Sequence, residues 1–238
     1  LNNTDMVFNS DYMLFYLLSI ALSVVGMIVS GRLQSKFRAY SKVGLRANKS
    51  GREIAEDMLQ HYGLHNVRVL ESNGFLSDHY NPVNRTVNLS PEVFHGRSVA
   101  ATAVAAHECG HAVQHDTAYS MLQLRSRIVP VVKVASMAQQ YLLLAAFMLA
   151  NTFPALMLVT IVAFAITTVF SLVTLPVEFD ASKRALAWID RRGVVTQEEY
   201  AGAKDALTWA GMTYVAAALS SLVMLIYLIL RYTGMSRN

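Results

Sequence analysis

The chain contains one cysteine, Cys109, and few charged side chains for its 238 residues. A single cysteine excludes an intramolecular disulfide, so the cysteine content does not identify the redox compartment. The charged share is 15%, against about 25% in soluble domains, and the hydrophobic share is 54%. No internal repeat and no low-complexity segment is present. This composition, with a mean hydropathy of +0.35, predicts a membrane protein rather than a soluble one.

The hydrophobic residues are gathered in four runs, each close to the length of a helix that crosses a bilayer (roughly 20 residues). The runs are 12–30, 128–150, 154–175 and 214–230. The first has no basic segment before it and no small-residue cleavage site after it, so we expect a retained span and not a signal peptide. Residues 151–154 predict a tight turn, which would join the second and third runs as a hairpin. The second run is the least regular, because Lys133, Gln139 and Gln140 make its first half amphipathic.

Basic residues indicate the orientation, because Lys and Arg are concentrated in the cytoplasmic loops of membrane proteins. They are frequent in 31–127 and 176–212 and absent from the turn between the second and third runs. We therefore expect those two segments in the cytoplasm and both termini outside, although Arg231 and Arg237 count weakly against this. The net charge of +4 has the same origin, so nucleic-acid binding is not expected.

The segment between the first two runs predicts a small α+β unit. Ser50-Gly51-Arg52-Glu53 fits a capping box, and Gly63 can end the helix that begins there. Alternating apolar residues predict strands over 66–70 and 85–90, separated by a polar, turn-rich stretch. A helix rich in Ala and Val is expected over 98–115.

That helix contains an H-E-x-x-H motif, His107-Glu108-Cys109-Gly110-His111. Histidines at i and i+4 project from one face of a helix, so both imidazoles can reach one zinc ion. Glu108 can then accept a proton from the zinc-bound water and pass it to the leaving amine. The alternative is a surface helix with two solvated histidines. The surrounding Ala and Val residues favour a buried helix instead, in which unpartnered His and Glu side chains would be costly.

Two other residues of this helix are not expected to bind the metal. His115 shares the face of His107 and His111, but it lies about 12 Å along the helix from His107, too far for ligands about 2 Å from one ion. We expect His115 to cap the helix, to support a ligand or to lie at the membrane surface. Cys109 faces another direction and should be a small buried residue.

The third ligand is expected from the segment after the third run, where Glu178 and Asp180 are the candidates. Pro176 suits the first turn of a helix there. Glu178 shares its helix face with small residues that allow close approach. Asp180 points away, and it precedes Lys183 and Arg184 at the spacing of an intrahelical salt bridge. We therefore expect Glu178 to complete the site.

Four stretches of the chain resemble the YugP-type neutral zinc metallopeptidases, a family of bacterial membrane proteins. The stretches are 78–82, 89–91, 105–114 and 175–182. More distantly, the chain is similar to the membrane metalloproteases of the heat-shock and prenyl-protein type. That resemblance implies a zinc peptidase whose third ligand is a Glu on a second helix. Those enzymes often have an Asp four residues later; Ser182 stands there in this chain, and it could accept a histidine N–H more weakly.

Two features could act on a substrate. Peptide hydrolysis requires a donor to the developing oxyanion, and Tyr80 or His79 could provide it. The alternative is that the stretch from Asp78 is an ordinary structured turn. The strand over 85–90 could pair with an extended substrate if its edge is free, or it could simply pack within the sheet.

A last amphipathic helix is expected over 194–211, with Thr196 and Glu199 as its cap, packed on the H-E-x-x-H helix. We expect Trp188, Tyr200 and Trp209 to mark the membrane interface.

Together these observations predict a mainly α membrane protein with about four transmembrane helices and a small cytoplasmic α+β, zincin-like catalytic part. The expected segments are 1–31 (tail and first span), 32–127 (cytoplasmic α+β), 128–175 (hairpin), 176–212 (cytoplasmic helices) and 213–238 (last span and tail). We expect a membrane-embedded, zinc-dependent endopeptidase of the glutamate-zincin type. Zn²⁺ would be held by His107, His111 and Glu178, with Glu108 as the general base.

The expected partners are membrane lipid and a peptide or protein substrate, and a homo-oligomer or a membrane partner protein stays open. Two alternatives belong to other classes. One is a membrane scaffold or regulator with a structural or vestigial zinc site, against which the intact Glu108 argues. The other is a transporter or channel component, against which the scarcity of ionisable residues in the spans argues.

Overall fold

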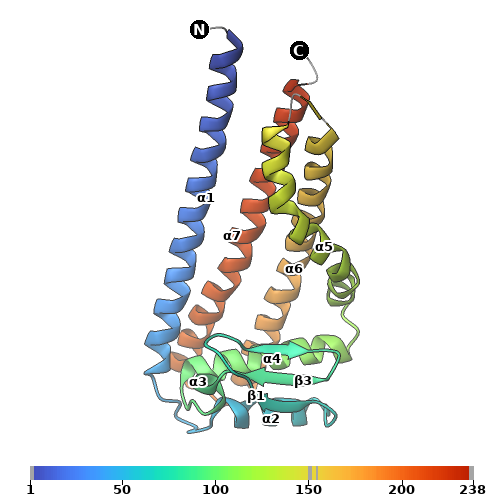
Figure 1. Cartoon of the computed structure of the whole chain (residues 1–238). Coiled ribbons are helices and arrows are strands. Elements are labelled where there is room, and N and C mark those ends of the chain that lie inside the picture. Colours follow the sequence, from blue (N-terminus) through green and yellow to red (C-terminus); the bar gives the residue numbers. More distant parts are fainter. Residues whose placement is uncertain (1–2, 150–151, 154, 236–238) are drawn as a thin grey trace. The chain divides into compact units, whose positions relative to one another are not determined.

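The computed structural model describes residues 3–149, 152–153 and 155–235. Its elements are α1 (Asn3–Ser41), α2 (Gly51–His61), β1 (Arg68–Glu71), β2 (His79–Asn81), β3 (Thr86–Leu89), α3 (Pro91–Phe94), α4 (Val99–Asp116), α5 (Ser120–Met148), α6 (Ala155–Arg191) and α7 (Gln197–Met235) (Figure 1). Helices α1, α5, α6 and α7 are long and apolar enough to cross a membrane. The protein is thus mainly helical with a small sheet, as expected. The turn expected over 151–154 lies partly outside the described residues.

The long helices continue beyond the apolar runs. Helix α1 extends to Ser41, and α6 passes through Pro176 without a break, so the prediction that Pro176 opens a helix is wrong. Proline removes one backbone hydrogen bond, but the chain satisfies its other peptide groups by remaining helical, which matters most in or near a bilayer. Helix α7 likewise runs on into the last apolar run. Thr196 and Glu199 exchange the predicted capping hydrogen bonds at its start, at 2.7 and 3.2 Å.

The chain divides into two units, and the first comprises Leu1–Ser30, Arg127–Val173 and Thr213–Asn238. Its core contains Ala146, Phe147, Met157, Phe164, Met224, Tyr227 and Leu228. Threonine hydroxyls join α5 and α6: Thr160 donates to the Leu142 carbonyl (3.2 Å), and Thr167 donates to Gln139 (3.2 Å). Polar contacts of this kind are common between helices in lipid.

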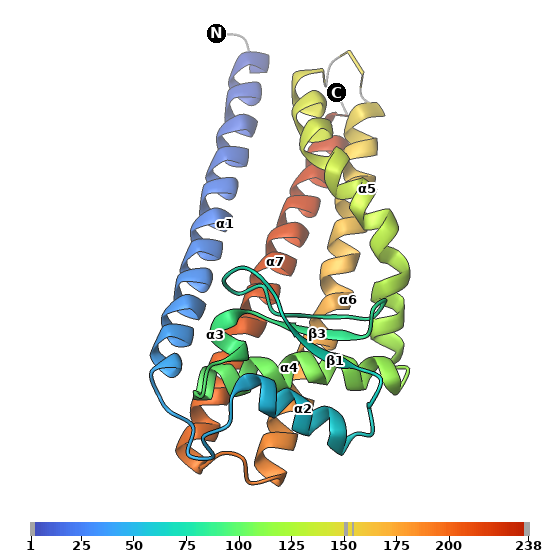
Figure 2. The same ribbon diagram turned by 60° about the horizontal axis from the view of Figure 1, so that its bottom comes forward.

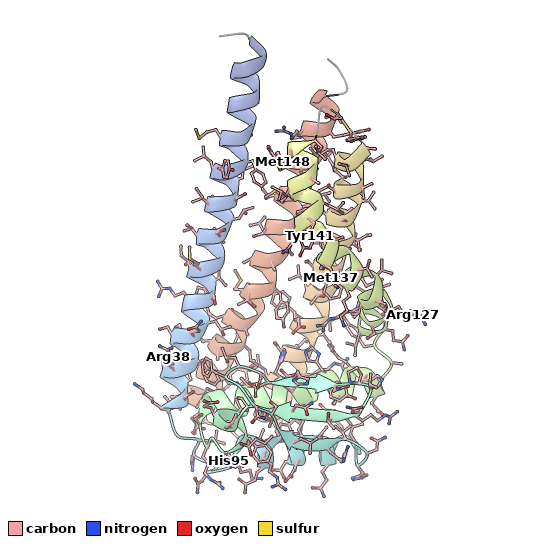
Figure 3. All side chains as sticks on the ribbon, in the orientation of Figure 1. Arg38, His95, Arg127, Met137, Tyr141 and Met148 are labelled. Atoms are coloured by element: carbon pink, nitrogen blue, oxygen red, sulfur yellow. The ribbon has the colours of Figure 1, made fainter. Side chains whose placement is uncertain are left out.

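One face of α5 in this unit is apolar and exposed. Met137, Tyr141 and Met148 point outward along it and are 70%, 70% and 74% exposed (Figure 3). Such a face suits contact with hydrocarbon rather than water.

The second unit comprises Gly31–Ser126 and Thr174–Met212. Helix α2 packs beside α4, and the sheet lies next to them (Figure 2). The core between them is fully buried at Ile54, Met58, Val87, Leu89 and Ala106. The predicted capping box is present, because the Ser50 side chain accepts from the Glu53 N–H and the Glu53 carboxylate accepts from the Ser50 N–H. Gly63, at φ 71°, ends α2 in the left-handed conformation that glycine adopts freely.

The sheet has the order β1-β3-β2, with β1 parallel and β2 antiparallel to β3. Strand β2 lies in the stretch that was expected to be polar and turn-rich, where no strand was predicted. The side-chain oxygen of Asn81 accepts from the backbone N–H groups of Val83 and Asn84, at 2.9 and 3.2 Å, and so closes the turn between β2 and β3. Strand β3 therefore has neighbours on both sides, and the idea that it offers a free edge to a substrate is wrong. The two edges of the sheet belong to β1 and β2.

Trp188 also differs from expectation. It is 3% exposed, within the core of the second unit, and therefore does not lie at a membrane interface. The sequence around Trp188 did not distinguish the two locations, because aromatic residues with a polar group suit both a protein core and a membrane interface.

Candidate metal centre

Helix α4 positions the H-E-x-x-H residues. Ser98 caps its first turn by accepting from the Ala101 N–H at 3.2 Å, and the alanines around the motif are buried as predicted. Because His107 and His111 are one turn apart, their rings lie on the same face, with centroids 4.8 Å apart.

Glu178 on α6 faces these two histidines. Its Oε2 atom is 3.3 Å from His107 Nε2 and 3.4 Å from His111 Nε2. The three side chains offer ligand atoms that all lie within 4.8 Å of one another. Asp180 is not part of this group, so Glu178 is the carboxylate that the fold brings to the histidines.

The group fits a bound cation better than it fits a hydrogen-bonded cluster. Glu178 Oε2 is buried and has no hydrogen-bond partner, although a carboxylate oxygen taken out of water requires one. Two nitrogens and one carboxylate oxygen facing a common point are the donor set of a zinc site. His107, His111 and Glu178 would therefore hold the ion.

A buried amide fixes the orientation of His111. His111 Nδ1 is 3.0 Å from Gln114 Oε1, while Gln114 Nε2 donates to the Val177 carbonyl and to Asp180, both at 2.8 Å. Because the Val177 carbonyl can only accept, the amide nitrogen must face it, and Gln114 Oε1 must accept the proton of His111 Nδ1. The lone pair of His111 Nε2 therefore faces Glu178, as metal ligation requires.

The partner of His107 is Ser182, whose Oγ lies 3.1 Å from Nδ1. The expected contact between Ser182 and a histidine is thus present. Asp180 also makes its expected intrahelical pair, accepting from Arg184 at 2.6 Å, and it adds the bond from Gln114 that the sequence did not indicate.

Glu108 is held by the sheet. The backbone N–H of Tyr80 donates to Glu108 Oε2 at 2.9 Å. This N–H belongs to β2 and points away from β3, so it lies on the free edge of the sheet. Glu108, the candidate general base, therefore contacts the edge strand β2 through the Tyr80 N–H.

The two oxyanion candidates lie differently. The Tyr80 hydroxyl is 2.9 Å from His115 Nδ1, which also gives His115 its role: it supports Tyr80 and is outside the ligand group. Burial raises the pKa of Tyr80, so the hydroxyl remains a donor at neutral pH. His79 is exposed, and its Nδ1 is 2.8 Å from the Ser77 carbonyl.

Asp78 anchors the start of β2 by accepting from the N–H and the hydroxyl of Ser90, at 2.7 and 3.1 Å. Burial raises the pKa of Asp78, which the bonds from Ser90 only partly oppose, and the nearby Glu108 charge raises it further. Asp78 thus sets the position of the backbone that contacts Glu108.

Burial and the neighbouring carboxylates shift the pKa values of two residues of α4, His111 and Cys109. Burial lowers the pKa of His111, but the Glu178 carboxylate and the Glu108 charge outweigh this, so the pKa lies above its ordinary value. Burial raises the pKa of Cys109 well above its ordinary value. Cys109 is therefore a protonated thiol, and its Sγ lies 3.6 Å from the Ala55 carbonyl oxygen. Its complete burial is in line with the expected role as a small buried residue.

Two residues of the site, Gln114 and Arg125, were not predicted from the sequence. Gln114 follows His111 by one helical turn, a spacing that could have suggested a contact. Arg125, which lies 3.1 Å from Glu178 Oε1, gave no signal, because it is 53 positions away in the chain.

Comparisons with known proteins identify the family of the chain. The chain belongs to the family described as "Putative neutral zinc metallopeptidase", whose sequence model matches residues 15–233. The chain is 41% identical over 210 residues to the "Putative membrane protease YugP" of Bacillus subtilis (strain 168), and the match covers 88% of this chain and 92% of that protein. No solved structure matches the chain.

Proposed function

We propose that the protein is a zinc-dependent endopeptidase of the membrane, with His107, His111 and Glu178 as zinc ligands and Glu108 as the general base. One observation supports this above all: three ligand atoms from two helices lie within 4.8 Å of one another, beside a glutamate that the free sheet edge holds in place.

Zinc, when bound there, would acidify a water molecule and polarise the scissile carbonyl. Glu108 accepts a proton from the attacking water and passes it to the leaving amine. Tyr80 is the proposed donor to the developing oxyanion, because its hydroxyl stays protonated and its backbone N–H contacts Glu108. His79 is the weaker candidate, since its ring is exposed and bonded to Ser77.

The outer edge of β2 is the proposed site of substrate pairing. A peptide added as a further strand would bind through backbone hydrogen bonds. It would lie beside Glu108, which accepts from the Tyr80 N–H on this edge. Binding of this type requires an extended, accessible stretch of substrate. It discriminates little between substrate side chains, because the hydrogen bonds are made by the backbone.

We place the second unit at the cytoplasmic face of the membrane. The distribution of Lys and Arg over 31–127 and 176–212 supports this orientation. Fusing a reporter that is active only in the cytoplasm to residue 120 or to the C-terminus tests it: activity is expected at the first position and not at the second.

The competing function is a scaffold with a structural zinc site. Structural sites are closed by four protein ligands, whereas catalytic sites have three and an open position. Within the described part of the chain, the cluster has three members, which favours catalysis.

Hydrolysis of casein or of a peptide library by the full chain, purified in detergent, is the deciding experiment. We expect cleavage that a chelator abolishes, that zinc restores, and that falls by about 10²–10⁴-fold in Glu108→Gln. The amide oxygen introduced by this substitution can still accept from the Tyr80 N–H, so the variant should fold and bind zinc. Zinc binding without cleavage in the wild type would favour the scaffold, and full cleavage by the variant would remove Glu108 as the base.

A further inference from the structure

The two oxygens of Glu178 have different surroundings. Oε2 faces both histidines, whereas Oε1 is paired with Arg125 Nη1 at 3.1 Å. The Glu178 side chain is 3% exposed and that of Arg125 is 28% exposed. Arg125 therefore reaches from the first turns of α5 into the base of the ligand group.

The pairing has a direct chemical consequence for a carboxylate ligand. An ionised carboxylate can bind a metal through one oxygen or through both. An oxygen that already accepts a charged hydrogen bond is a poor second ligand, because its electron density is shared with the guanidinium. With Oε1 occupied, Oε2 is the atom left for the ion.

The same pairing lets the carboxylate be buried in its ionised form. A carboxylate at 3% exposure loses most of its hydration, and an uncompensated charge there is strongly unfavourable. The other ion-pair partners of Glu178 are His107 and His111, which are cations only when protonated and could not be cations while they bind a metal. Among the residues that the structure describes, Arg125 is the partner of Glu178 whose positive charge is permanent.

We propose that Arg125 is a positioning residue that makes Glu178 a one-oxygen ligand and so keeps one position on the metal open for water and substrate. This rests on the proposed zinc site. The inference adds to that site a residue of α5, Arg125, that controls the coordination number of the metal. Helices α4 and α6, which carry the ligands, do not supply this control by themselves.

The test uses the full chain loaded with Co²⁺ alone, because the visible absorption of Co²⁺ weakens as its coordination number rises. We expect Arg125→Gln to have weaker absorption than the wild type and a zinc Kd raised about tenfold, the size expected for a residue that supports a ligand. Arg125→Lys should restore both, since the ion pair has one recorded N–O contact and a lysine can supply one. Arg127→Gln is the matched control: Arg127 is two residues further along α5 and projects outward (Figure 3), so both readouts should stay at wild-type values.

A wild-type Co²⁺ spectrum and zinc Kd in Arg125→Gln would overturn the inference. So would an Arg125→Lys variant as defective as Arg125→Gln, because the charge would then not be the cause. Circular dichroism of the metal-free variants separates these results from unfolding, and if Arg125→Gln does not fold, Arg125→Lys alone decides. Failure of the wild type to bind either metal would instead remove the proposed function itself.

Discussion

Gly110 lies against the backbone of Ala181 so closely that a Cβ added to it would be 2.6 Å from the Ala181 carbonyl oxygen. No real Cβ makes such a contact with a backbone atom, so the site needs glycine at this position. Gly110 is the second variable residue of the H-E-x-x-H motif, and Ala181 is three residues after Glu178. The close approach of α4 and α6 at this pair brings the third ligand to the histidines.

The first prediction concerns this contact. Gly110→Ala should push α4 and α6 apart and lower the free energy of unfolding by roughly 1–3 kcal/mol, the usual range for overpacking. Zinc content, measured by metal analysis, should fall as well, because Glu178 moves with α6. Gly31→Ala is the control, since a Cβ at Gly31 meets nothing within 4 Å. As a helical Gly→Ala change without a clash, it should lower neither the Tm nor the zinc content. Full zinc content and an unchanged Tm in Gly110→Ala would contradict the packing argument.

The second prediction separates the two acidic residues of α6. Glu178→Ala removes a ligand and should abolish stoichiometric zinc binding. Asp180→Ala removes the acceptor of bonds from Gln114 and Arg184, so it should retain zinc with a Kd raised about tenfold. Zinc titration of the two metal-free variants measures this. The assignment would be reversed if Asp180→Ala lost zinc and Glu178→Ala kept it.

The third prediction addresses the buried amide. Gln114→Leu leaves His111 Nδ1 and the Val177 carbonyl without their partners, so the zinc Kd should rise about 10–100-fold. The Tm of the metal-free protein should fall as well, because unpaired buried groups are costly. Gln60→Leu, at an exposed position of α2, is the control for changing a glutamine to leucine. Equal zinc affinities of the two variants would show that His111 does not depend on Gln114.

The fourth prediction distinguishes Tyr80 from His79. Tyr80→Phe should lower kcat by about 10²-fold, the cost of one oxyanion donor, with KM and zinc content unchanged. It keeps the backbone N–H that binds Glu108, so the loss would belong to the hydroxyl. His79→Ala should remain near wild-type activity. Steady-state kinetics on one peptide decides, and the opposite pattern would transfer the role to His79.

The sequence by itself determined the local features of this protein. The periodicity of His107 and His111, the capping residues Ser50 and Thr196 and the apolar runs all depend on neighbours within a few positions, so the sequence predicts them directly. Glu178 was also predictable, because the small residues on its helix face indicate a close helix contact.

Only the tertiary structure decided which distant groups meet. The ion pair of Arg125 with Glu178, the bond from Tyr80 N–H to Glu108, and the outer place of β2 join segments that are far apart in the chain. Such contacts depend on how elements pack, and a single sequence carries no local pattern for them. Pro176 illustrates the reverse case: its local preference for a helix start was overridden, because the hydrogen bonds and packing of a continuous α6 are worth more than the one bond that proline removes.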